Sequence, residues 1–414
     1  MPTNGNLKDE IASARRTIKS DSYSISLGEL ISQYENNEIE IHPEFQRLFR
    51  WTSAQKSRLI ETILLGIPLP SIFVMQREDS IWELIDGLQR ISTVLEFVGK
   101  LKNEKGKQLA PLELASTEYL PSLQGMYYDD EGHNRSFTAD QRLAFRRAKI
   151  DVTILLPESS VQARGELFDR LNTGGSQATP QEIRFARFVM EDPKFAAWLK
   201  SLRALPEFDS TVSLSTRLTD ESYDMELIGR FISSVDARVE DLAKIESIEE
   251  FLTTRLLLLL YKEKALSSSP TSKVATVGPY SNMPAGLKEK STITAPVRTA
   301  AEYEDLFRRT FTVIRKSIGE DAFRPYDSTK GRFKGSFSVS AFEFVTCGVS
   351  WNIDDWENTT QSISGQKQLL DLVQKSWDEE RFRTPSGRGS SSRTRLREIV
   401  PFAREYFALE AVKN

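Results

Sequence analysis

Cysteine and histidine are scarce in this chain of 414 residues. The one cysteine, Cys347, cannot form a disulfide within the chain, and we expect a reducing, cytoplasmic setting. One cysteine and two distant histidines, His42 and His133, do not supply a zinc site of Cys and His type. The segment GHNR at 132–135 sets a histidine beside an asparagine, but no second histidine follows it. The composition therefore argues against a His-Asn-His nuclease in this chain.

Long apolar runs and a strong charge of one sign are also missing. The run LLLLLY at 256–261 is too short to cross a bilayer, and the first residues, MPTNGNLKDEIASARR, lack the apolar core of a secretory signal. We expect no membrane partner. The net charge is −4, so any contact with nucleic acid must come from a local basic patch. An apolar fraction of 39% and a charged fraction of 28% are typical of a globular protein, here of two or three domains.

Apolar periodicity predicts helices and strands together in the first part of the chain. One helix should bury Leu27, Leu30, Ile31 and Tyr34, and a second, capped by Ser53, should bury Leu59, Ile60, Ile63 and Leu64. Strands are predicted within GIPLPSIFVMQ, SIWELIDG and AKIDVTILLP, the first two antiparallel across the turn REDS. The helix ISTVLEFV follows the second strand. This mixture indicates a small α+β domain.

The remainder is predicted to be mostly helical. A helix over SSVQARGELFDRLN should end at the glycine pair 174–175, and another should start at Pro180 with Thr179 as its cap and Glu182 in a capping box. The last helix should be interrupted or kinked near Pro401. The expected organisation is a polar segment 1–24, the α+β domain 25–190, a helical region 191–265, a linker or mobile loop 266–298, and a helical domain 299–414 with a basic loop 381–397.

The stretch DGLQR at 86–90 stands between a predicted strand and a predicted helix. On one interpretation it is a helix cap, with Asp86 as the cap, Gln89 completing a capping box and Gly87 allowing a positive φ. That interpretation leaves Arg90 unexplained, because a cation in the first turn is unfavourable to the helix dipole. On the other interpretation, the helix N-terminus and Arg90 form a phosphate site.

Two further clusters carry basic and polar residues. PEFQRLFRWTSAQKSRLIE contains Gln46, Arg47, Arg50, Lys56 and Arg58, which could equally form a solvated basic face. FDRLNTGGSQATPQEIR contains Arg170, Asn172 and Arg184, where the asparagine could be a simple polar residue at a helix end.

In order and spacing, PEFQRLFRW, LIETILLGIPLPSIFV, ELIDGLQRISTVLEFV and LFDRLNTGGSQATPQEIR resemble the N-terminal domain of GmrSD-type restriction systems, which carries a DGQQR motif. That domain looks related to the ParB and sulfiredoxin fold, a small mixed sheet with helices. The resemblance covers roughly residues 25–190, and a weaker one continues through DAFRPYD, FSVSAFEFV and the basic segment.

The resemblance implies binding of a nucleoside triphosphate with magnesium, and in some relatives its hydrolysis, coupled to the handling of DNA in prokaryotic phage defence. It implies catalytic roles for Asp86, Gln89 and Arg90. The implied nucleotide-binding residues are Arg47, Pro68, Asp86, Gly87, Gln89, Arg90, Ser92, Thr93, Arg170 and Asn172. The implied magnesium ligands, all with oxygen donors, are Asp86, Glu61 and Asn172.

Two departures from the family pattern limit the implied function. Leu88 stands where the motif has its first glutamine, so a polar contact is lost, and the chain could be a catalytically inactive ParB-like binding or scaffold module. Relatives that cut DNA carry a His-Asn-His nuclease domain, for which histidines are lacking here. We therefore expect a sensor or regulator that leaves cutting to a nuclease partner, while homo-oligomer formation stays open.

The segment RFRTPSGRGSSSRTRLR at 381–397 contains no acid. Among its arginines, Arg388, Arg393, Arg395 and Arg397 are the candidates for contact with DNA phosphates. The alternative is a solvated loop without a partner.

Overall fold

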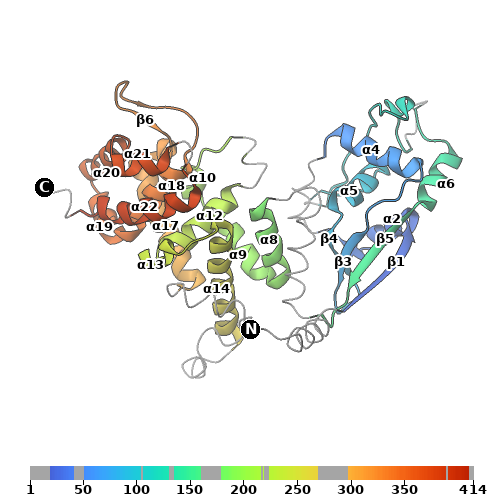
Figure 1. Ribbon diagram of the computed structural model, residues 1–414, viewed down its shortest axis with the longest axis horizontal. Coiled ribbons are helices and arrows are strands. Elements are labelled where there is room, and N and C mark those ends of the chain that lie inside the picture. The colour runs from blue at the N-terminus through green and yellow to red at the C-terminus, as the bar shows by residue number, and fades with distance from the viewer. Residues whose placement is uncertain are drawn as a thin grey trace, which may run out of the picture. The chain divides into compact units, whose positions relative to one another are not determined.

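The computed structural model describes residues 19–41, 51–103, 106–129, 135–159, 179–215, 218, 223–268, 297–387 and 390–409. The chain forms two compact units, Met1–Ala178 and Thr179–Asn414. Their elements are labelled in Figure 1. An α+β chain with a small mixed sheet near its N-terminus and a helical remainder is confirmed.

A five-stranded mixed sheet in the order β1-β5-β3-β4-β2 forms the centre of the first unit. Its strands are β1 (Ser20–Ser26), β2 (Ile39–Glu40), β3 (Ile72–Gln76), β4 (Trp82–Asp86) and β5 (Lys149–Leu155). β3 is antiparallel to β4, as predicted, and parallel to β5. β1 pairs with β5 in the antiparallel sense and β2 with β4 in the parallel sense, and neither of these two outer strands was predicted.

The helices of this unit are α2 (Leu27–Glu35), α4 (Ser53–Leu64), α5 (Leu88–Phe97), the 3-10 helix η1 (Pro121–Leu123) and α6 (Ala139–Arg147). The buried residues of α2 are the four predicted for it. The predicted cap of α4 is wrong: Thr52 is the N-cap and forms a capping box with Gln55, while Ser53 is the first helical residue. Phe97 lies in the core, its ring 5.1 Å from that of Phe137.

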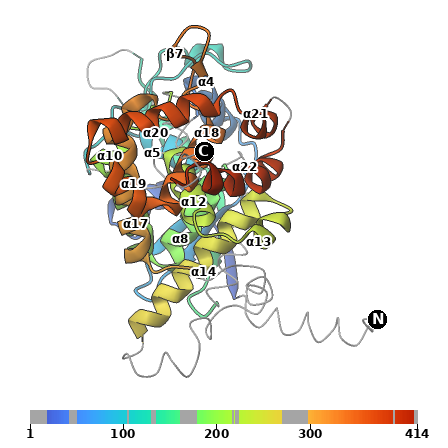
Figure 2. The same cartoon turned by 90° about the vertical axis from the view of Figure 1, so that its left-hand side faces the viewer.

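The second unit is helical. Its elements are α8 (Pro180–Glu191), α9 (Pro193–Arg203), α10 (Pro206–Asp209), α12 (Tyr223–Ser234), α13 (Val239–Ala243), α14 (Ile248–Ser268), α17 (Ala300–Ser317), the 3-10 helix η2 (Gly319–Asp321), β6 (Tyr326–Asp327), β7 (Arg332–Phe333), α18 (Val339–Trp351), α19 (Ile353–Thr359), α20 (Ile363–Ser376), α21 (Glu380–Ser386) and α22 (Ser392–Tyr406). Figure 2 shows the helices of this unit from its own side. α18 is buried from Ser340 to Ser350 and therefore runs through the core. None of the described helices is both long and apolar enough to cross a membrane.

Two predictions for the second unit are corrected. The expected basic loop 381–397 is largely helical, because Phe382 of α21 packs with its ring 4.7 Å from that of Phe344 and 5.1 Å from that of Trp377. The predicted interruption near Pro401 is wrong, because α22 continues through it, whereas the predicted alternative, a kink, stays a prediction. Residues 160–175 of the helix expected at 159–175, and most of the linker expected at 266–298, lie outside the described residues.

The boundary between the units lies closer to the N-terminus than the expected domain end at 190. α8 belongs to the second unit, where Phe188 and Val189 are part of the hydrophobic core.

Candidate functional site

The turn from β4 into α5 depends on a glycine. Asp86 ends β4, and Gly87, with φ +101°, is the N-cap of α5. A Cβ atom on Gly87 would lie 2.4 Å from Cγ2 of Ile72, in the neighbouring strand β3. Both the left-handed backbone and the close approach of β3 therefore require glycine at this position.

The capping-box interpretation of this turn is wrong, because no side chain caps α5. The Asp86 carboxylate accepts a hydrogen bond from Arg90, between Oδ2 and Nη2, at 3.0 Å. Gln89 Oε1 accepts one from the backbone amide of Trp51 at 3.2 Å. Both side chains of the supposed box are thus turned to other partners, and the first turn of α5 keeps the positive end of its dipole without a capping carboxylate.

Arg90 lies at this helix N-terminus. Its Nη1 donates to the carbonyl oxygen of Pro70 at 3.1 Å, so the guanidinium joins the end of β4 to the turn before β3. The Arg90 side chain is 14% exposed and the Asp86 side chain 29%. Nη2 comes within 3.4 Å of the position of a Cβ on Gly87, which places the guanidinium against the turn itself. A fixed cation beside an uncapped helix N-terminus is an arrangement that can bind an anion.

Other residues predicted for the nucleotide have different surroundings. Ser92 and Thr93 are buried inside the packing of α5, where the Thr93 hydroxyl donates to the Gln89 carbonyl at 2.6 Å. Pro68 is exposed in the turn between α4 and β3. Leu88, the departure from the family motif, is partly buried and packs against the core of its unit.

Glu61, a predicted magnesium ligand, holds a loop in the structure. It accepts the backbone amides of Tyr119 at 2.9 Å and Leu120 at 3.0 Å. A hydrogen bond with Thr117 and these amides hold the pKa of the Glu61 carboxyl below its ordinary value. To bind a metal, Glu61 would have to give up these bonds.

Within the described parts of the chain, no group of three or more His, Cys, Asp or Glu side chains could hold a metal ion. Of the two implied magnesium ligands that the structure describes, Asp86 and Glu61, Asp86 lies at the α5 turn. Four residues of the predicted sites, Arg47, Arg170, Asn172 and Arg388, lie outside the described residues.

The predicted DNA contact Arg395 is engaged inside the second unit. Its Nε donates to Glu343 Oε2 at 3.0 Å and its Nη2 to Ser392 Oγ at 3.0 Å. Glu343, on α18 and 1% exposed, also accepts Arg230 Nη1 at 2.6 Å. Arg395 therefore neutralises a buried carboxylate, and this structural role explains its position without DNA.

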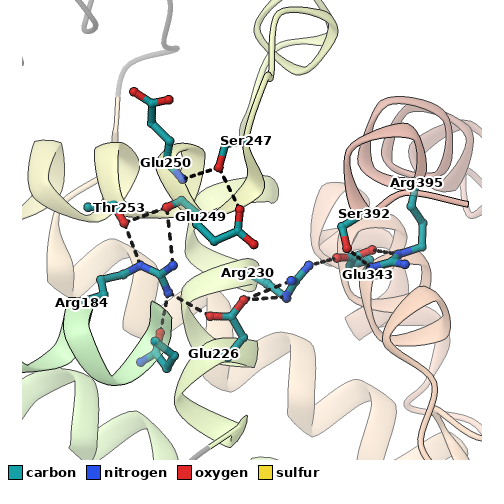
Figure 3. Close-up of polar contacts among 11 residues, drawn as sticks. Arg184, Glu226, Arg230, Ser247, Glu249, Glu250, Thr253, Glu343, Ser392 and Arg395 are labelled. Atoms are coloured by element: carbon teal, nitrogen blue, oxygen red, sulfur yellow. Dashed lines mark hydrogen bonds and ion pairs between the residues drawn. The ribbon is translucent and has the colours of Figure 1, made fainter. Parts of the chain in front are cut away.

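The ion pairs continue from Arg230 across the unit, as Figure 3 shows. Arg230 binds Glu226 one helical turn earlier on α12, and Glu226 binds Arg184 of α8 at 2.9 Å. Arg184 also donates to Thr253 Oγ1 at 3.0 Å. We call Arg184, Glu226, Arg230, Glu343 and Arg395 the buried ion network. The sequence analysis missed it; the signal was the spacing of Glu226 and Arg230 at i and i+4 around the apolar pair Leu227 and Ile228.

The remaining basic-segment candidates differ from each other. Arg397 donates to the carbonyl oxygens of Leu242 at 3.2 Å and Ile245 at 2.7 Å. Arg393 is exposed. Of the described candidates for DNA contact, Arg393 is therefore the one directed to solvent.

Residues 27–189 match a family model described as the N-terminal domain of the GmrSD restriction endonuclease. The matched range contains the α5 turn, four of the five strands of the sheet and all but the last two residues of α8. Neither the curated proteins nor the solved structures gave a match.

Proposed function

We propose, from the match of residues 27–189 to the model of the GmrSD restriction endonuclease N-terminal domain, that the chain is a regulatory component of a DNA-directed, restriction-type defence system. In this proposal it binds a nucleoside triphosphate with magnesium. The proposed phosphate site is the turn Asp86–Arg90. Cutting of DNA is assigned to a partner protein.

The observation that carries this proposal is the position of Arg90. A cation in the first turn of a helix opposes the helix dipole, and the bonds of Arg90 to Asp86 and to the Pro70 carbonyl hold it in this position. A phosphate bound at the α5 N-terminus would interact favourably with both the dipole and the guanidinium.

The side chains of the turn then have separate roles. Arg90 holds a phosphate, and Asp86, through its bond to Arg90 Nη2, keeps the guanidinium in place. Gln89 positions Trp51 through its backbone amide. Magnesium, when bound, supplies charge neutralisation at the phosphates, and it would take most of its ligands from the nucleotide and water because few carboxylates are present.

Calorimetry of the full chain with ATP, GTP, CTP and UTP, each with magnesium, tests this proposal. We expect one triphosphate to bind, Arg90→Ala to abolish binding, and Arg90→Lys to weaken it strongly because an ammonium cannot keep both hydrogen bonds. Arg147→Ala, which removes an exposed arginine from α6, is the matched control and should bind normally. If folded Arg90→Ala binds like the unmodified chain, the site is assigned wrongly.

A second candidate function, a binding or scaffold module without turnover, is favoured by Leu88. The leucine side chain has no polar group to offer a nucleotide, and it packs against the core of its unit. Phosphate release in the presence and absence of DNA separates the two functions: a scaffold releases none. Supercoiled plasmid should stay intact with the chain and magnesium or manganese, since cutting is left to the partner.

A further inference from the structure

A β-hairpin projects from the helices of the second unit. β6 and β7 pair antiparallel, with Tyr326 opposite Phe333 and Asp327 opposite Arg332. Both views show this hairpin as an arm standing out from α18 and α20 (Figures 1 and 2). Its tip, residues 328–332, is exposed throughout. Phe333 packs against the core of the unit and Ser328 Oγ donates to Asp378 Oδ1 at 3.1 Å, whereas the side chains of Lys330 and Arg332 are exposed.

The tip nevertheless has a fixed conformation. Asp327 Oδ1 accepts the backbone amides of Thr329 at 3.1 Å and Lys330 at 3.2 Å, which closes the turn. Asp327 Oδ2 accepts Lys334 Nζ at 2.8 Å, and this ammonium holds the pKa of the Asp327 carboxyl well below its usual range. The rings of Tyr326 and Phe333 meet at 5.0 Å at the base. The tip is therefore preorganised, so binding would cost little conformational entropy.

The charges of the hairpin divide into paired and outward ones. Arg324 binds Asp321 at 2.7 Å, and Lys334 binds Asp327. Lys330 and Arg332 are exposed and form no ion pair with another described residue. Asp321 and Asp327 are thus paired at the base of the hairpin, and the tip carries two cations. A further acid, Asp378 beyond the end of α20, accepts Ser328 Oγ at 3.1 Å.

We propose that this tip, residues 328–332, contacts the phosphate backbone of duplex DNA through Lys330 and Arg332. Phosphates are the partners of such exposed cations, and a two-stranded ribbon fits the major groove of B-form DNA. The choice of DNA as the polyanion rests on the proposed restriction-type function, whereas the tip lies in the other unit from the nucleotide site. The contact is not specific for sequence.

Binding of the full chain to a labelled 30-base-pair duplex of arbitrary sequence, measured by anisotropy at several salt concentrations, tests the proposal. The double variant Lys330→Ala/Arg332→Ala should bind about tenfold more weakly at low salt, with a salt slope lower by roughly 2. The matched control Lys367→Ala/Lys375→Ala removes two exposed cations of α20 and should retain affinity and slope.

A third variant separates a preorganised tip from general electrostatic attraction. Asp327→Ala removes an acid, so attraction by charge alone predicts tighter binding to DNA. Loss of the bonds that close the tip predicts weaker binding, although both cations remain, and this is the result that we expect.

The proposal is overturned if the unmodified chain does not bind the duplex, if both double variants weaken binding equally, or if Asp327→Ala binds more tightly. Stronger binding to an RNA duplex of the same sequence would overturn the choice of DNA. Calorimetry of the hairpin variants with the nucleotide separates the two proposals, because the substitutions in the hairpin should leave the affinity for the nucleotide unchanged. A chain that binds no nucleotide but shows the expected DNA result would refute the nucleotide site alone.

Discussion

At the scale of single residues, the candidate site depends on Gly87. Its positive φ could be predicted from DGLQR, since a tight turn from strand to helix often requires glycine. The pairing of Asp86 with Arg90 could not be predicted from the sequence, because it depends on whether the helix begins after Asp86 or after Gly87. Because the N-cap is Gly87 and not Asp86, the Asp86 carboxylate does not cap the helix and pairs with Arg90.

Gly87→Ala should lower the free energy of unfolding of the first unit by about 3 kcal/mol, since it combines left-handed strain with a clash against Ile72. Gly66 is the matched control: its φ is +68°, but a Cβ there would meet open space. Gly66→Ala should therefore cost only about 1 kcal/mol. Urea unfolding of both variants measures the difference, and equal losses would show that the contact with Ile72 is unimportant.

At the scale of elements, periodicity predicted the helices and strands that carry an apolar pattern of their own. It missed those that are stabilised by strand pairing or by one distant aromatic contact. α2, β3, β4 and β5 each bury an apolar pattern and were predicted. β1 is a serine-rich edge strand whose only fully buried residue is Ile25, so its pairing with β5 leaves no apolar alternation in the sequence. α21 likewise forms in a segment that reads as a polar loop, because Phe382 packs on distant aromatic rings.

The link between α4 and the loop 117–120 should depend on pH through Glu61. The pKa of this carboxyl is lowered in the folded state, so its stabilising effect is present above the unfolded value, about 4.3, and is lost as the pH falls through the folded value. Glu61→Gln should thus be less stable than the unmodified chain at pH 7, and the gap should close below about pH 4.

Urea midpoints at pH 7 and pH 3.5, without metal, test this effect of Glu61. The exposed Glu118, in the same loop, serves as the control, and Glu118→Gln should match the unmodified chain at both pH values. A gap for Glu61→Gln that stays constant with pH would contradict the role assigned to the carboxylate.

At the scale of the whole molecule, the family match and the compact units end at different places. The match extends to residue 189, whereas the first unit ends at Ala178. The last matched helix, α8, supplies Phe188 and Arg184 to the second unit. The similarity in sequence therefore crosses a structural boundary, which the amino-acid pattern alone could not place.

The two hydrophobic cores share no residue, so the units should respond separately to core mutations. Phe188→Ala should destabilise the second unit by about 3–5 kcal/mol and Phe97→Ala the first by a similar amount. Hydrogen exchange measures the outcome: Phe188→Ala should reduce protection in α12 and α18 only, and Phe97→Ala in β3 and β5 only. Loss of protection in both units from either variant would show that they unfold as one.

The buried ion network also constrains how this chain can change over generations. Its three arginines share two glutamates, so replacement of either glutamate leaves buried cations without a partner carboxylate, whereas replacement of one arginine leaves equal numbers of both charges. An apolar version of the same core could be equally stable, yet a path to it that replaces a glutamate before its arginines passes through a weakened protein. The substitutions in the network are thus epistatic: the effect of each on stability depends on which were made before it, so their order decides which sequences can evolve.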